Sequence, residues 1–324
     1  MKKRILGRTG FAVSDIGFGA WAIGGGWGDQ DEGESVKALH TAIDHGLNFI
    51  DTAAGYGGGR SERIIGRVLK ERKEKLYVAT KTPPMAGAWP PTPYDRAEDR
   101  YPEKYIRESV EERLKNLGVE AIDVLQLHTW TRAWNANPTP LHVLAKLKEE
   151  GKVLNYGIST PENDQDCVVD LMKRGLIDTV QVIYNIFEQQ PAAELLPVAR
   201  ETNTGIIVRV AFDEGSLTGK FAADTRFAEG DFRNRYFAGD RLERTVARVE
   251  AIRELVKESG YTMAQIALLF VLADPAVSTV IPGIRNVRQA ELNTAISDLK
   301  PLPQTLIDEL RKHLWLKSHW YSGK

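Results

Sequence analysis

The sequence predicts an α/β fold in which eight parallel strands close into a (β/α)8, or TIM, barrel. Short β-branched and apolar runs alternate with longer segments of helical period, which is the pattern of βα units around a parallel sheet. The intervening segments are amphipathic, with apolar residues spaced by three and four as in Val36, Leu39 and Ile43. The strand candidates number eight, as a barrel requires: residues 16–19, 48–51, 76–80, 123–127, 153–158, 179–183, 205–208 and 277–282. We therefore expect one barrel domain over residues 1–324.

Several segments depart from the simple alternation. A Pro-rich connection over 83–102 and a Gly-rich, charged connection over 212–240 are long enough to predict functional loops at the C-terminal face of the barrel. The tail over 301–324 predicts an additional helix at 305–314. Ser61 and Thr160 are each followed by an acidic residue, which predicts that their hydroxyl groups cap helix starts.

The composition favours a cytoplasmic protein with a small, uncharged partner. Lys and Arg total 43 against 44 for Asp and Glu, a formal charge of -1, so we expect no nucleic acid or anionic membrane partner. The longest apolar run, 266–273, is shorter than the ~18 residues that span a bilayer, and the N-terminal apolar run is shorter than the roughly 7–15 residues of an export signal. Cys167 is the single cysteine, and we expect it to pack in the core. The histidine spacing predicts no metal site, and the oligomeric state stays open.

Four polar residues lie at the predicted mouth of the barrel. Asp51 ends the second strand candidate, Lys81 and His128 directly follow the third and fourth, and Tyr56 follows Asp51 by five positions. Each alone has an ordinary explanation as a cap, a solvated charge, a core imidazole or a packed ring. Because the C-terminal ends of barrel strands meet at one mouth, their joint occurrence predicts an active site.

These segments resemble the aldo-keto reductase family over nearly the whole chain. The matching motifs are Phe49-Ile-Asp51-Thr-Ala, Tyr56-Gly, Ser61-Glu62, Ala79-Thr-Lys81, Leu125-Gln-Leu-His128, Gly157-Ile-Ser159, Tyr184-Asn185, Leu217-Thr-Gly-Lys220 and Ile281-Pro-Gly283 to Asn293. The resemblance implies a barrel, a catalytic tetrad of Asp51, Tyr56, Lys81 and His128, and hydride transfer from a nicotinamide cofactor. The function it implies is NADPH-dependent reduction of an aldehyde or ketone to an alcohol.

Elementary chemistry agrees with that tetrad. Carbonyl reduction needs a proton donor beside the developing alkoxide, and a free phenol with a pKa of about 10 is a reluctant donor. We expect Lys81 to lower the pKa of Tyr56 and Asp51 to hold the ammonium of Lys81 in place. His128 would donate a second hydrogen bond to the substrate oxygen.

No Gly-x-Gly-x-x-Gly motif occurs, so the sequence does not predict a Rossmann domain. The resemblance implies a cofactor site of a different kind. Ser159, Thr160 and Gln181 would hold the nicotinamide amide. Residues of the last two strand ends would hold the rest of NADP(H): Leu217, Gly219 and Lys220 at the pyrophosphate, and Gly283, Arg285, Gln289 and Asn293 at the adenosine. Arg285 and Arg288 offer positive charge to a 2′-phosphate, which favours NADP over NAD.

Two positions depart from the family pattern. Thr160 stands where the family has Asn, so one contact to the carboxamide is lost. Arg209 stands where the family has an aromatic residue packed on the nicotinamide ring. A planar guanidinium can stack on a ring face, so Arg209 is a candidate cofactor residue; the alternative is an ion pair with Asp213 or Glu214.

The substrate and the functional class are less well defined. Trp27, Trp89 and Trp130 lie in loops that open at the mouth, where they would line a substrate pocket or anchor their loops to the barrel. A rival function is a cofactor-sensing regulatory subunit resembling the beta subunits of potassium channels. A barrel hydrolase is disfavoured because it requires paired carboxylates or a metal at the mouth.

Overall fold

The computed structural model describes residues 1–25, 28 and 30–316 and contains an eight-stranded sheet with the order β10-β9-β8-β7-β6-β5-β4-β3. All neighbouring strands are parallel. Parallel bridges from Ile16 to Val280 and from Gly19 to Gly283 join the first strand to the last. The predicted (β/α)8 barrel is therefore confirmed. The strands are β3 Phe18–Gly19, β4 Phe49–Asp51, β5 Tyr77–Thr82, β6 Ile122–Leu127, β7 Val153–Ser159, β8 Thr179–Ile183, β9 Gly205–Arg209 and β10 Val277–Val280.

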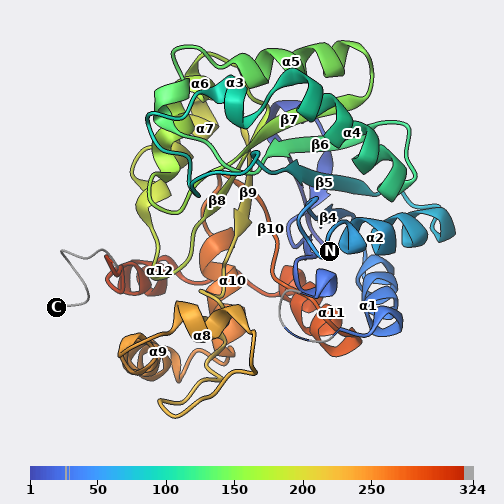
Figure 1. Ribbon diagram of the computed structural model, residues 1–324. Helices are drawn as coiled ribbons and strands as arrows, with labels where there is room; N and C mark the ends of the chain where they lie inside the picture. Colours follow the sequence, from blue (N-terminus) through green and yellow to red (C-terminus); the bar gives the residue numbers. More distant parts are fainter. Residues whose placement is uncertain (26–27, 29, 317–324) are drawn as a thin grey trace.

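Helices surround the strands (Figure 1). The amphipathic segments predicted from Val36, Ile106 and Leu141 are the helices α1, α4 and α5. The helices are α1 Glu32–Asp44, α2 Arg60–Glu71, α3 Ala97–Arg100, α4 Glu103–Leu117, α5 Thr139–Glu149, α6 Val169–Lys173, α7 Leu195–Thr202, α8 Phe232–Tyr236, α9 Arg241–Val256, α10 Met263–Leu272, α11 Val287–Thr294 and α12 Gln304–Arg311. Short helix α3 falls within the first long connection, α8 within the second and α12 within the tail. In the part of the chain that the structure describes, no helix combines the length and apolar character needed to cross a membrane.

Both predicted capping hydroxyls were wrong. Helix α2 begins beside Ser61, but Gly59 occupies the cap position, and the Ser61 hydroxyl donates instead to the carbonyl of Ala20 at 3.0 Å. No helix begins at Thr160: the next helical turn starts at Gln165, and the Thr160 hydroxyl donates to the carbonyl of Gln181 at 3.2 Å. Contacts between neighbouring strand ends outcompete the local caps that the sequence pattern favours.

An antiparallel hairpin of β1 (Lys3–Ile5) and β2 (Ala12–Ser14) precedes the barrel and was not predicted. Leu6 and Val13 of this region pack with Phe49, Val124 and Ile207 in a buried cluster, so the hairpin closes the N-terminal end of the barrel. The remaining core fills the space between strands and helices, and it includes the fully buried Cys167, as predicted.

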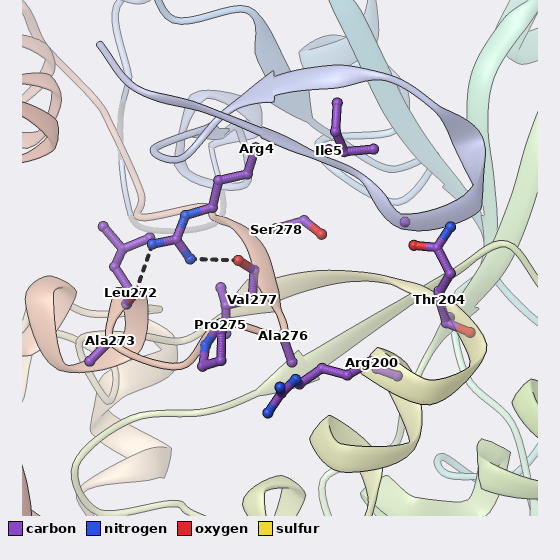
Figure 2. Close-up of a pocket in the computed structure, with 13 residues that line it drawn as sticks. Arg4, Ile5, Arg200, Thr204, Leu272, Ala273, Pro275, Ala276, Val277 and Ser278 are labelled. Atoms are coloured by element: carbon purple, nitrogen blue, oxygen red, sulfur yellow. Dashed lines mark hydrogen bonds between the residues drawn. The ribbon is translucent and has the colours of Figure 1, made fainter.

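A cavity of about 450 Å³ lies beside this hairpin, at the starts of β9 and β10 (Figure 2). Arg4 donates across it to the carbonyl groups of Leu272 and Val277, both at 2.7 Å. This pairing fixes the hairpin to the end of α10. Barrel enzymes carry their active sites at the opposite, C-terminal face, so we do not assign the active site to this cavity.

Candidate active site

The strand ends bring the four predicted catalytic residues to one place at the C-terminal mouth. The Lys81 ammonium on β5 lies 2.6 Å from Asp51 Oδ2 at the end of β4, and 3.3 Å from the Tyr56 hydroxyl. The ring of His128, which follows β6, lies 6.0 Å from the Tyr56 ring in an edge-to-face arrangement. Lys81 is fully buried, so its charge acts on Asp51 and Tyr56 in a water-poor environment.

Backbone contacts position Tyr56 in the turn after β4. The Thr52 amide donates to the carbonyl of Ala79 at 2.8 Å, and the Lys81 ammonium donates to the carbonyl of Thr52 at 2.8 Å. Gly24 packs directly on this turn: a Cβ atom there would lie 2.7 Å from the Tyr56 carbonyl carbon. Only glycine fits such a close approach, so the first glycine-rich loop supports the turn that carries Tyr56.

Burial raises the pKa of Tyr56 above its ordinary value, and the nearby Lys81 opposes this increase without reversing it. The expected influence of Lys81 has the right sign, but the expected net lowering of the pKa was wrong, because removal of the phenol from water has the larger effect. Tyr56 is consequently protonated near neutral pH. A protonated phenol is the form that a proton donor requires.

His128 is electrically neutral at physiological pH. Burial holds its pKa well below the ordinary value, and the positive charges of Lys81 and Arg209 act in the same direction. A neutral imidazole carries one N–H group, which can donate to an oxygen in the mouth. His128 also contacts the Trp89 ring edge-to-face at 5.5 Å.

Two glutamine side chains contact the second oxygen of Asp51. Gln181 Nε2 on β8 lies 2.7 Å from Asp51 Oδ1, and Gln126 Nε2 on β6 lies 3.4 Å from the same atom. The Ser159 hydroxyl donates to Gln181 Oε1 at 3.4 Å. The predicted amide-binding residues Ser159 and Gln181 are therefore linked to the ion pair of Asp51 and Lys81. Gln126 was not among the site residues predicted from the sequence. It is a polar residue in an apolar strand, two positions before His128, so both side chains lie on the same face of that strand. This pattern could have identified it.

Arg209 ends β9 and points into the same mouth. Its Nη2 donates to the carbonyl of Thr160 and to Glu162 Oε1, both at 3.0 Å. The structure thus pairs Arg209 with the carboxylate of Glu162, whereas the sequence suggested Asp213 or Glu214. Its guanidinium is close enough to act electrostatically on both Tyr56 and His128.

The segment after Arg209 has an unusual backbone. Val210, Asp213 and Glu214 all have positive φ values, of 55°, 46° and 55°. Such a conformation is strained, above all for a β-branched residue, and persists only where other contacts enforce it. Here Asn185 Nδ2 donates to the carbonyl of Val210 at 2.9 Å, and the Tyr236 hydroxyl donates to Asp213 at 2.8 Å. These contacts hold the chain that orients Arg209.

The remaining predicted cofactor residues follow the last two strands. Leu217 is fully buried within the short helical turn Ser216–Thr218 after β9, Gly219 ends this turn with a φ of 71°, and Lys220 follows it, exposed. Gly283 follows β10 and bridges to Gly19. At the start of α11, Gln289 Oε1 accepts from the Arg285 amide at 2.8 Å, and Asn293 is buried further along this helix.

A cavity of about 560 Å³ lies near Arg285, between the first loop and Arg60. Gln30 lines this cavity and accepts from Arg285 Nε at 2.9 Å. The loops that follow the first and the last strands therefore contact each other here.

The three tryptophans predicted to line a substrate pocket have different settings. Trp89 is 52% exposed and lies beside His128, as such a role requires. Trp130 is fully buried and donates its indole N–H to Asn135 at 2.8 Å, so in this structure it anchors its loop and does not face the open mouth. Trp27 lies outside the described residues. Trp21, not selected from the sequence, lies 6.4 Å from the Tyr56 ring and contacts Phe232 of α8.

The chain is similar to proteins of a known family. Residues 15–314 match the sequence model of the Aldo/keto reductase family. The chain belongs to this family. Among its relatives are the aldo-keto reductase YhdN of Bacillus subtilis, 31% identical over 92% of this chain and 89% of the relative, and an NADH-specific methylglyoxal reductase of Escherichia coli, 31% identical over 97% and 99% of the two chains.

The structures of aldo/keto reductases also match the fold. The structure of a glycerol dehydrogenase from Gluconobacter oxydans superimposes with a TM-score of 0.77 at 28% identity, over 95% of this chain and 94% of that one. Membership of the aldo/keto reductase family supports carbonyl reduction by an oxidoreductase that uses a nicotinamide cofactor. The family includes a member named as NADH-specific, so membership alone does not determine the choice between NAD and NADP.

Proposed function

We propose that this protein reduces the carbonyl group of an aldehyde or ketone to an alcohol with NADPH, and that Tyr56 delivers the proton. The observation that carries the proposal is the position of Lys81, whose buried ammonium lies 2.6 Å from Asp51 and 3.3 Å from the Tyr56 hydroxyl. A cation fixed beside a phenol stabilises the phenolate that remains after proton transfer.

The proton and the developing negative charge are handled by two side chains. Tyr56, protonated at neutral pH, donates its proton to the carbonyl oxygen as the alkoxide forms. Neutral His128 donates an N–H hydrogen bond to the same oxygen. Two fixed donors aimed at one developing oxyanion lower the barrier most effectively in a site that excludes water. Lys81 and Asp51 do not touch the substrate. Lys81 positions the Tyr56 hydroxyl, and Asp51 holds the Lys81 ammonium in place.

The described residues fit a nicotinamide cofactor. Ser159 and Gln181 supply a hydroxyl and an amide suited to a carboxamide, and two buried polar atoms at the mouth, Gln126 Oε1 and Arg209 Nε, have no hydrogen-bond partner among the described residues. Buried polar atoms normally have partners, so these two favour a site completed by a ligand. When bound, reduced nicotinamide supplies the hydride for carbonyl reduction. Thr160 uses its hydroxyl on the Gln181 backbone, so it is not a carboxamide ligand in this proposal.

The preference for NADP rests on the region around α11. Arg285 donates to Gln30, which lines the cavity beside the first loop, and the exposed Arg288 lies within the first turn of α11. Positive side chains and free amides at a helix start favour a phosphate group. We assign the 2′-phosphate to Arg285, with Gly283, Gln289 and Asn293 around the adenosine and Leu217, Gly219 and Lys220 at the pyrophosphate.

Arg209 is proposed to pack near the nicotinamide. Its guanidinium is planar, and its Nη2 is held by Glu162 and by the Thr160 carbonyl, so its orientation is fixed before any ligand arrives. A cation in this position disfavours the positively charged oxidised ring. We therefore infer that Arg209 favours binding of the reduced cofactor over the oxidised one.

The substrate is proposed to contact the aromatic residues near Tyr56. Trp89, Trp21 and Phe232 each contact a catalytic residue or one another, and Trp89 and Phe232 are partly exposed. Aromatic walls with one polar centre suit a carbonyl compound with an apolar body. Trp27 stays a candidate for the same wall on sequence grounds.

A turnover assay distinguishes this proposal from a cofactor-sensing regulatory subunit. The wild-type protein is mixed with NADPH and a panel of aromatic, aliphatic and sugar aldehydes and ketones, and cofactor oxidation is followed. We expect carbonyl-dependent turnover with at least one class of substrate. Tight cofactor binding without turnover on any carbonyl would favour the regulatory function instead.

A further inference from the structure

Two buried amide donors lie near the same oxygen of Asp51, at unequal distances. Gln181 Nε2 makes a short contact of 2.7 Å to Asp51 Oδ1, whereas Gln126 Nε2 is held at 3.4 Å, near the limit of a hydrogen bond. Both glutamines are almost completely buried. The second oxygen, Oδ2, is occupied by Lys81 at 2.6 Å. Gln181 thus makes a short hydrogen bond to Oδ1, and Gln126 makes a long one to the same atom.

The backbone explains why both glutamines face Asp51. Gln126 pairs in register with Lys81 on β5, so the two side chains lie at the same level of the barrel. Gln181 pairs in register with Ser159 on β7. Neighbouring residues of parallel strands project to the same side, which brings all four side chains to the interior layer that contains Asp51.

Gln126 is the less satisfied of the two glutamines. In the part of the chain that the structure describes, its buried Oε1 has no hydrogen-bond partner, and its Nε2 makes only the long contact to Asp51. Leaving a buried amide this poorly paired is unfavourable, which favours a state in which its Nε2 makes a shorter hydrogen bond. Gln181, by contrast, uses both ends of its amide, on Asp51 and on Ser159.

We propose that Gln126 is a positioning residue that replaces Gln181 on Asp51 when the cofactor binds. In the free protein Gln181 donates to Asp51 Oδ1. When Gln181 engages the cofactor, as the proposed function requires, its amide leaves Asp51, and Gln126 closes its long contact to the same oxygen. The Asp51 carboxylate then keeps one amide donor throughout, and Lys81 keeps its position beside Tyr56. The exchange couples occupancy of the cofactor site to the catalytic ion pair without a movement of the backbone.

The test is the dissociation constant of NADPH, and of NADH in parallel, measured by calorimetry on the full chain. Gln126→Met keeps an unbranched side chain of similar length but removes the amide. We expect it to weaken cofactor binding about tenfold, the effect of losing one hydrogen bond to a charged group. Gln126→Asn, which is one methylene too short to reach Asp51, should behave in the same way while keeping a polar side chain.

Two controls separate the exchange from a packing effect. Thr279→Val also removes a buried, unpaired polar atom from a barrel strand, but it lies on β10 and is expected to leave the dissociation constant unchanged. In an Asp51→Asn background the oxygen no longer carries a full charge, so Gln126→Met should change the constant by less than about twofold. Thermal unfolding of each variant confirms that it is folded.

The outcomes are distinct. Unchanged cofactor binding in both Gln126 variants would overturn the exchange and leave the proposed function intact. A tenfold loss that persists undiminished with Asp51→Asn would also overturn it, because Gln126 would then act by packing. Failure of the wild-type protein to bind either cofactor would overturn the proposed function itself, and the exchange with it.

Discussion

Lys81 Nζ and Asp51 Oδ2 are 2.6 Å apart, and the exposed fractions of their side chains are 0% and 3%. Taking two such charges out of water is costly, and their attraction compensates only when both charges are present and well paired. The barrel therefore contains an ion pair that is a poor choice for stability alone. Its position beside the Tyr56 hydroxyl fits the proposed role of this pair in catalysis.

Breaking this pair from one side is expected to destabilise the fold strongly. Lys81→Met leaves a buried carboxylate without its cation and should lower the free energy of unfolding by about 3–5 kcal/mol. The double variant Asp51→Leu with Lys81→Met carries neither charge and should recover most of that loss. Urea unfolding of the two single variants and the double variant measures this coupling. Additive losses would show that the two side chains act independently.

The reduction rate is expected to be nearly flat from about pH 6.5 to 9. Burial raises the pKa of Tyr56, so the phenol stays protonated below its ordinary pKa of about 10. The contribution of Tyr56 to the stability of the fold is lost only as the pH rises through the raised pKa. The pKa of His128 is lowered by burial, so its contribution is present above about pH 6.5 and is lost as the pH falls through the lowered value. A pH profile of kcat/KM checks this. An inflection near pH 6.5 that disappears in His128→Gln would contradict the neutral assignment.

Arg285→Ala is expected to weaken NADPH binding by about 1.5–3 kcal/mol and NADH binding far less, because only NADPH carries the 2′-phosphate. Arg285 also contacts Gln30, so Gln30→Ala serves as the control and should affect both cofactors equally. Calorimetric titration of both cofactors gives the comparison. Equal losses for NADPH and NADH in Arg285→Ala would remove the assignment of the 2′-phosphate to this residue.

Arg209→Tyr is expected to lower the preference for NADPH over NADP by roughly five- to tenfold, about 1–1.4 kcal/mol. The reason is the loss of a cation that repels the oxidised ring. Glu162→Gln keeps Arg209 but removes its partner charge, 3.0 Å away, and should shift the ratio of the two dissociation constants in the opposite direction. If neither substitution moves this ratio, Arg209 does not lie near the ring.

The sequence predicted the barrel, and the grouping of Asp51, Tyr56, Lys81 and His128 at its mouth, for physical reasons. Buried parallel strands are continuous apolar runs that end in polar residues, so both the strands and the strand-end positions of Asp51, Lys81 and His128 are visible in the pattern. The hairpin of β1 and β2 was less visible, because its first strand contains Lys3 and Arg4 and alternates no apolar face. Its burial comes from closing the barrel, which is a tertiary effect.

Contacts between distant segments were beyond the reach of the sequence pattern. Glu162 pairs with Arg209 across 47 positions, whereas the sequence interpretation considered only the nearby Asp213 and Glu214. The hydroxyl of Thr160 bonds to the backbone of Gln181 instead of capping a helix. The net pKa of Tyr56 depended on how far burial outweighs Lys81, which only the folded structure determines.

The proposal that Tyr56 is the proton donor of a carbonyl reductase is tested most directly by Tyr56→Phe. The variant keeps the ring that contacts His128 and Trp21 but lacks the hydroxyl beside Lys81. Turnover of NADPH with the best carbonyl substrate of the wild-type protein should fall by about 10²–10⁴-fold, the usual contribution of a general acid, while the dissociation constant of NADPH changes by less than about twofold. Retention of most of the wild-type rate would contradict the account.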